Sequence, residues 1–82
     1  MSRQNAIRFL HDVDGLEELR HEIYVCEGYD ALFELLAEAG YAFTGAEFEE
    51  AVDHLHVSCA THEEADILMG KANWFRMVAA NA

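Results

Sequence analysis

Residues 40–48 combine a signal that ends one helix with a signal that begins the next. Gly40 follows a run of good helix formers and can take the positive φ that ends a helix without a clash from a Cβ atom. Thr44 and Glu47 are spaced as a capping box, in which each side chain accepts a hydrogen bond from the backbone amide of the other residue. Phe43 and Phe48 flank this box at the spacing of a hydrophobic staple. The segment therefore predicts two helices joined by a short turn.

Helical patterns also account for the rest of the chain. The sequence has no proline and no alternating apolar pattern long enough for a strand, and its apolar residues recur every three or four positions. We therefore predict an all-α protein, a small bundle of about five short helices in which neighbours along the chain pack together. Residues 1–82 would form one domain. The predicted helices cover Arg3 to His11, a stretch capped by Asp14 with Glu17, Tyr29 to Ala39, Gly45 to about Cys59, and an additional C-terminal stretch, 61–80, capped by Thr61 with Glu64.

The same spacing predicts which side chains are buried. Inward positions of the first two helices are Ala6, Phe9, Leu10, Leu16, Leu19 and Ile23. The tyrosines lie near predicted helix ends, where we expect them to pack with their hydroxyl groups in water: Tyr24, Tyr29 and Tyr41.

Charge and cysteine content limit the class of protein. Sixteen acidic residues against five basic ones give a formal net charge of −11, which repels phosphate backbones and anionic lipid. We expect no nucleic-acid partner and no membrane partner, because no apolar run of about 18 residues is present either. Cys26 and Cys59 are too few for a disulfide scaffold and are interpreted as thiols of a reducing compartment. The N-terminus has no signal-peptide pattern, so the predicted location is the cytoplasm.

Three segments together point to a family. They are "NAIRFLHDV" near the N-terminus, "GLEELR" after it, and "LLAEAGYAFTGAEFEEAV" at residues 35–52. With these motifs the chain resembles the Nif-eleven family over residues 3–56, and the most specific element is the "EAGYAFT" turn followed by an acidic helix. The resemblance implies a small helical domain that is encoded in bacterial nitrogen-fixation gene clusters and is also used as the leader of ribosomally made, enzymatically modified peptides.

The resemblance implies two functions that the C-terminal sequence distinguishes. A leader should carry a Gly-Gly or Gly-Ala protease site and then a core rich in Cys, Ser and Thr. Here all five glycines are isolated, Gly70 is followed by Lys71, and His62 to Ala82 contains no Cys, Ser or Thr. The expected function is therefore that of a non-catalytic accessory protein of nitrogen fixation that binds another protein. A leader-type domain recognised by a peptide-modifying enzyme is the alternative.

No pattern in the sequence indicates catalysis or a bound cofactor. Glycine-rich phosphate loops, nucleophile elbows and nucleotide-binding fingerprints are absent from the sequence. The acidic runs "EFEE" and "HEEAD" are typical of solvated helix faces. We therefore expect no enzyme activity and no cofactor.

One segment could instead make the protein a metal-binding carrier. His56, Cys59 and His62 are three residues apart and could approach a zinc ion from one side of a continuous helix. However, Thr61 is a strong cap signal, which places His62 in the next helix and breaks that geometry. Cys59 also continues a buried stripe, as free cysteines often do. The favoured interpretation is a core thiol with surface histidines and no metal site.

The expected partner surface lies near the C-terminus, at Trp74, Phe75, Arg76 and Met77. Tryptophan, methionine and arginine are enriched at protein interfaces, and these side chains cannot all lie on one inward stripe. The alternative is that a small domain needs the same apolar groups to complete its core. The sequence leaves the partner and the oligomeric state open.

Overall fold

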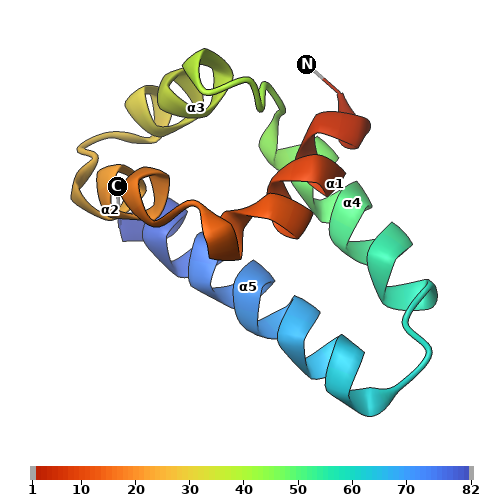
Figure 1. The fold of residues 1–82 in the computed structure, drawn as a ribbon. Helices are drawn as coiled ribbons and strands as arrows, with labels where there is room; N and C mark the ends of the chain where they lie inside the picture. The colour runs from red at the N-terminus through yellow and green to blue at the C-terminus, as the bar shows by residue number, and fades with distance from the viewer. Residues whose placement is uncertain (1, 82) are drawn as a thin grey trace.

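The computed structural model describes residues 2–81, and these residues form α-helices and no strand (Figure 1). A short 3-10 helix, Val13–Gly15, joins the first two α-helices. The predicted all-α class is therefore confirmed. The five α-helices of this part of the chain are α1 (Arg3–Asp12), α2 (Glu17–Val25), α3 (Tyr29–Glu38), α4 (Gly45–Val57) and α5 (His62–Asn81).

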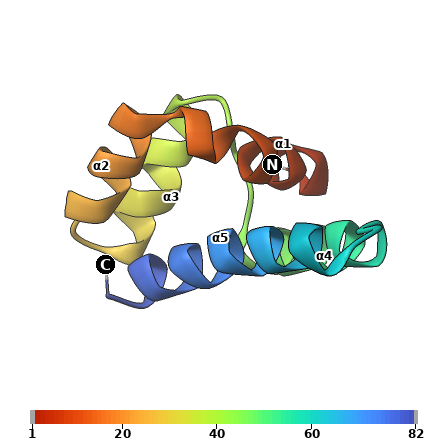
Figure 2. The ribbon, with the colours of Figure 1, turned by 60° about the horizontal axis from the view of Figure 1, so that its bottom comes forward.

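The helices pack partly as chain neighbours and partly across the chain. α4 and α5 form a helical hairpin, as expected of neighbours (Figures 1 and 2). The most extensive contact, however, joins α1 to α4, which are far apart in sequence. Hydrogen bonds from the amide of Ser2 and from Nδ2 of Asn5 to the carbonyl oxygen of Ala42, at 3.1 and 2.9 Å, hold the start of α1 against the turn before α4. Neighbour packing alone was therefore an incomplete prediction.

The core combines side chains from all five helices. Ala6, Phe9 and Leu10 of α1 are buried, which confirms the predicted inward face of that helix. In α2 only Ile23 is fully buried, while Leu16 and Leu19 pack against the edge of the core. The later helices add Leu32, Leu36, Phe48, Ala51, Val52, Leu68, Ala72, Phe75 and Val78.

α5 is the longest helix, with 20 residues. Its buried face is confined to four positions spaced three or four apart, and its other side chains are partly or fully exposed, including the apolar Ile67 and Met77. Within residues 2–81, no helix combines the length and the apolar character that a membrane crossing requires.

Two of the predicted helix caps differ in the structure. Asp14 does not cap α2, because it lies in the 3-10 helix and its Oδ2 pairs with Nζ of Lys71 at 3.3 Å. Leu16 takes the capping position without a side-chain bond. At α5, Thr61 Oγ1 accepts from the amide of Glu64 at 3.1 Å as predicted. In a regular capping box Glu64 would accept from the amide of Thr61. Its Oε2 instead accepts from the amide of Ala60 at 2.7 Å, so the box is displaced by one residue.

Candidate functional site

The turn between α3 and α4 has the conformation that the sequence predicted. Gly40 has φ of +93°, so its lack of a Cβ atom is required there. Thr44 Oγ1 accepts from the amide of Glu47 at 3.1 Å, and Glu47 Oε1 accepts from the amide of Thr44 at 2.9 Å. The rings of Phe43 and Phe48 stack with centroids 6.1 Å apart. The predicted capping box is therefore confirmed, and it fixes the start of α4.

Tyr41 holds this turn against α1, which corrects the expectation that its hydroxyl group lies in water. The residue is only 9% exposed, and its hydroxyl donates to Oδ2 of Asp12 at 2.8 Å. The guanidinium of Arg8 lies 5.0 Å from the centre of the Tyr41 ring and donates to the carbonyl oxygen of Gly40 at 3.2 Å. The sequence motifs around residues 5–12 and 40–44 are thus two sides of one contact.

The bond to Asp12 predicts how stability responds to alkaline pH. This hydrogen bond, together with burial, raises the pKa of Tyr41 above its ordinary value of 10.0. Because the folded state favours the neutral phenol, its contribution is complete below pH 10.0 and is lost as pH rises through the folded-state pKa. We expect Tyr41→Phe to lower the free energy of unfolding by about 1 kcal/mol at neutral pH. In urea titrations the difference from the parent chain should shrink above pH 10.0, and a constant difference would contradict this assignment.

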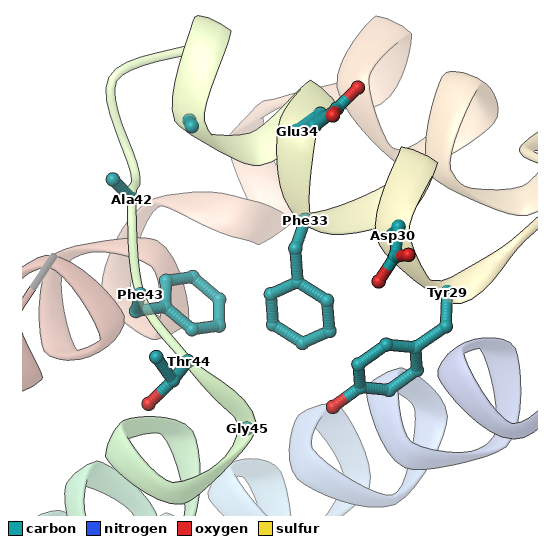
Figure 3. Close-up of a pocket in the computed structure, with 9 residues that line it drawn as sticks. Tyr29, Asp30, Phe33, Glu34, Ala42, Phe43, Thr44 and Gly45 are labelled. Carbon is teal, nitrogen blue, oxygen red and sulfur yellow. The ribbon is translucent and has the colours of Figure 1, made fainter.

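An open groove lies between α3 and the turn that leads into α4 (Figure 3). Its volume is about 500 Å³, which is within the range of ligand pockets. One wall comes from α3 and consists of Tyr29, Asp30, Phe33, Glu34 and Ala37. The other wall is the segment Ala42, Phe43, Thr44 and Gly45. We call this feature the Phe33 groove, because the ring of Phe33 extends from the α3 wall toward the opposite wall (Figure 3).

Aromatic rings form the floor of the Phe33 groove. The ring centroid of Phe33 lies 4.7 Å from that of Tyr29 and 5.7 Å from that of Phe43. Tyr29 is nevertheless 52% exposed, and its hydroxyl points toward the start of α4 (Figure 3). A Cβ atom on Gly45 would lie 2.8 Å from that hydroxyl oxygen, so glycine gives Tyr29 room there. A second hollow of about 420 Å³ shares these two residues and Phe33 and extends toward Phe75.

The Phe33 groove is apolar at its floor and negative at its rim. Its lining includes the carboxylates of Asp30 and Glu34 and contains no Lys, Arg or His. The carboxylate of Asp30 lies beside the Phe33 and Tyr29 rings, whereas that of Glu34 points away from them (Figure 3). Among residues 2–81 the ion pairs join other acids, Asp14 and Glu49, to basic side chains. The groove therefore offers apolar contact area and unpaired negative charge to a ligand.

The expected partner surface at Trp74 to Met77 is not one continuous patch. Phe75 is only 2% exposed and belongs to the core, so its inclusion in that surface was wrong. Arg76 Nη2 and Nε bond the carboxylate of Glu49 at 2.6 and 3.0 Å, which lowers the pKa of Glu49. Trp74 is partly buried against the core, and Met77 is 54% exposed. Phe75, and in part Trp74, therefore belong to the core, as the alternative interpretation predicted.

The weak metal candidates do not come together. Within residues 2–81, no group of three or more His, Cys, Asp or Glu side chains is arranged to hold a metal ion. His56 lies in α4 and His62 begins α5, with a turn between them. The thiol of Cys59 donates to the carbonyl oxygen of Leu55 at 3.3 Å. Both Cys59 and Cys26 are partly buried and pack against the core.

Sequence reasoning missed the Phe33 groove, although part of its signal was present. Tyr29 and Phe33 are four residues apart and therefore share one face of a helix. An aromatic pair directly after Gly28, with Asp30 and Glu34 beside it, could have been compared with the C-terminal aromatics as a second candidate surface. The opposite wall depends on where the chain passes after Gly40, and no spacing rule gives that path.

Comparison with known proteins matches the N-terminal part of this chain to a protein family. The family model described as the Nif11 domain matches residues 1–48. No curated protein and no solved structure matches the chain. The matched part contains α1, α2, α3, the turn and the start of α4, and therefore both walls of the Phe33 groove.

Proposed function

We propose that this chain, which belongs to the Nif11 family, works by binding another protein and not by catalysis. The observation that carries this proposal is the Phe33 groove, an open aromatic surface inside the part of the chain that the family model matches. Open grooves with an apolar floor, aromatic side chains and a polar rim are typical of binding sites. In the expected C-terminal surface, by contrast, Phe75 is buried and is not available to a partner.

The geometry of Tyr29 supports binding in particular. Half-exposed tyrosines that pack on another ring present a large, rigid contact area at low entropic cost. Tyr29 has this arrangement on Phe33, and it lines both hollows. A partner seated over Tyr29 would cover the two hollows together.

The proposed setting follows from the resemblance to the Nif-eleven family. We place the protein in the cytoplasm of a nitrogen-fixing cell, as an acidic accessory factor of nitrogen fixation. The formal net charge of −11 supports a protein partner over nucleic acid or anionic lipid. Catalysis is not part of the proposal, because the described groove lining combines two carboxylates with the hydroxyl groups of Tyr29 and Thr44 and includes no histidine, cysteine or lysine.

Two exposed tyrosines allow a matched test of this function. Tyr29→Ala removes one aromatic side chain from the α3 wall of the groove, whereas Tyr24→Ala removes a tyrosine that is 71% exposed and lines none of the described hollows. We expect partner recovered by crosslinking and purification from the native host, grown without fixed nitrogen, to fall at least about fivefold for Tyr29→Ala. Tyr24→Ala should leave recovery unchanged. Equal recovery with both variants, or no specific partner for the parent chain, would refute the proposal.

A leader-type domain is the second candidate, because the family match supports such a role in general. A peptide-modifying enzyme would then be the partner. The intact mass of the chain recovered in the same experiment separates the two functions. An unmodified, uncleaved chain supports the accessory role, whereas modified residues or cleavage near Gly70 support the leader role.

A further inference from the structure

We infer that the Phe33 groove binds a basic amphipathic helix of a partner protein, with an aromatic or aliphatic anchor over Phe33 and Lys or Arg side chains beside Asp30 and Glu34. The inference rests on the proposed function and adds the chemistry of the partner to it. Its basis is the combination of an apolar floor with an acidic rim that has no cation of its own.

The floor determines the apolar part of the partner. Phe33 is only partly buried, although its ring contacts those of Tyr29, Phe43 and Phe75 at centroid distances of 4.7, 5.7 and 6.1 Å. A large apolar side chain would bury the free face of the Phe33 ring, and an aromatic one would also gain from ring–ring contact. Ala37 and Ala42 keep the mouth open, because neither side chain extends beyond Cβ.

The rim determines the charge of the partner. Asp30 and Glu34 are one turn apart on the same wall, and no basic residue lines the groove. Of the acids that line the two hollows, Glu49 is paired with Arg76, whereas Asp30 and Glu34 form no ion pair within residues 2–81. A cationic segment would therefore be attracted to this rim, while an acidic one would be repelled.

A second copy of this chain does not fit these requirements. Each copy carries a formal net charge of −11, so association of two copies brings like charges together. Of the five Lys and Arg residues, three are already held within the chain: Arg8 against Tyr41, Lys71 against Asp14, and Arg76 against Glu49. The chain thus offers few cations to the groove of another copy.

The secondary structure around the groove favours a helical partner. An extended peptide usually gains affinity by adding a strand to a sheet edge, and residues 2–81 contain no strand. A helix instead inserts side chains spaced three and four residues apart into a groove. The two hollows share Tyr29 and Phe33, so successive anchors of such a helix would have adjoining places to occupy.

The test uses peptides selected on the full chain. A display library of random peptides is enriched on the immobilised protein, and the enriched peptides are synthesised and titrated into it in solution. We expect them to carry Lys or Arg together with aromatic or aliphatic residues at helical spacing. Their affinity should fall as the salt concentration rises, because ion pairs at an exposed rim are screened.

Two double variants separate charge at the groove from charge elsewhere. Asp30→Asn with Glu34→Gln removes two charges at the rim, and Glu63→Gln with Asp66→Asn removes two on the exposed side of α5. The pairs are matched, since Asp30 and Glu63 each lie in the first turn of a helix. We expect the first pair to weaken binding about fivefold and the second to leave it unchanged, since each exposed ion pair contributes up to about 1 kcal/mol.

The other outcomes would overturn the inference in distinguishable ways. Acidic or neutral peptides that still require Tyr29 would refute the basic partner but leave the groove, and thus the proposed function, in place. Peptides that bind equally to both double variants and to Tyr29→Ala, or a library that enriches no peptide, would refute both. A dimer in sedimentation experiments that Tyr29→Ala dissociates would identify a second copy as the occupant.

Discussion

Phe75→Ala is expected to lower the free energy of unfolding by about 3–5 kcal/mol, the usual cost of removing a buried phenylalanine. An 82-residue domain has a total stability of only about 4–12 kcal/mol, at 0.05–0.15 kcal/mol per residue. The variant should therefore lose a large share of its stability, and it would be largely unfolded at ordinary temperature if the parent chain lies near the lower end of that range. Urea denaturation followed by far-ultraviolet circular dichroism measures the loss.

The reason for this large effect is the position of Phe75 among other aromatic rings. Its ring centroid lies 4.6 Å from that of Phe48, 5.4 Å from that of Phe9 and 6.0 Å from that of Phe43. These partners come from α1, α4 and the turn between α3 and α4. Truncation at Phe75 would leave a cavity where the three segments meet, and helices on several sides would have to move to fill it.

Two other substitutions serve as controls for this prediction. Phe75→Leu keeps most of the volume and should cost about 1 kcal/mol, as volume-conserving changes do. Met77→Ala changes a side chain that is 54% exposed on the same helix and should alter stability by less than about 0.5 kcal/mol. A loss below about 1 kcal/mol for Phe75→Ala would contradict the central position of this ring.

This prediction also concerns the extent of the domain. The match to the family model ends at residue 48, whereas Phe75 lies in α5. Because Phe75 packs on Phe9, Phe43 and Phe48, the matched segment receives part of its core from outside the match. We therefore expect residues 1–48 to depend on α5 for stability.

Local signals in the sequence predicted the helices well. Both hydrogen bonds of a capping box join residues that lie within four positions of the chain, so the spacing of Thr44 and Glu47 was sufficient to predict the start of α4. Gly40 likewise needs only its own backbone angle to end the preceding helix. Burial of Phe9 and Leu10 followed from a helical stripe, which also depends only on nearby residues.

The incorrect predictions involve partners that are distant in sequence. Asp14 has the residue type of a helix cap, but Lys71 competes for its carboxylate from α5. Tyr41 lies at a helix end, but α1 brings Asp12 to its hydroxyl group. A tertiary contact formed in place of the predicted cap at Asp14 and in place of the predicted solvent exposure of the Tyr41 hydroxyl group, and no pattern within a short window records such a contact.

The same limit explains why Phe75 was predicted to lie at a partner surface although it is buried. Residue types near the C-terminus are typical of interfaces, yet burial decides whether they are available, and Phe75 is buried. The Phe33 groove requires α3 and residues 42–45 to face each other, which depends on the course of the chain after Gly40. The pair of Tyr29 and Phe33 was visible in the sequence, but the space between the walls was not.

Of the two variants Ala37→Lys and Ala37→Glu, we expect the lysine variant to be the more stable and the glutamate variant to bind the partner more tightly. Ala37 is exposed and lines the groove close to the C-terminal end of α3. Lysine is favoured there by the helix dipole and by Glu34 one turn earlier, whereas glutamate is disfavoured by both. We therefore expect urea titrations to give the lysine variant a free energy of unfolding that equals or exceeds that of the glutamate variant, by up to about 1 kcal/mol.

Binding of a basic helix should follow the reverse order. Both substitutions place a long side chain at the mouth of the groove, but lysine also repels the partner and neutralises Glu34, while glutamate adds to the attraction. We expect the lysine variant to bind the selected basic peptides roughly thirtyfold more weakly than the glutamate variant, which corresponds to about 2 kcal/mol. Isothermal titration calorimetry measures this ratio directly. Since the weaker binder is the more stable protein, unfolding cannot produce the difference. Equal losses would show that the groove is used without regard to charge, and unchanged affinity in both variants would place the binding site elsewhere.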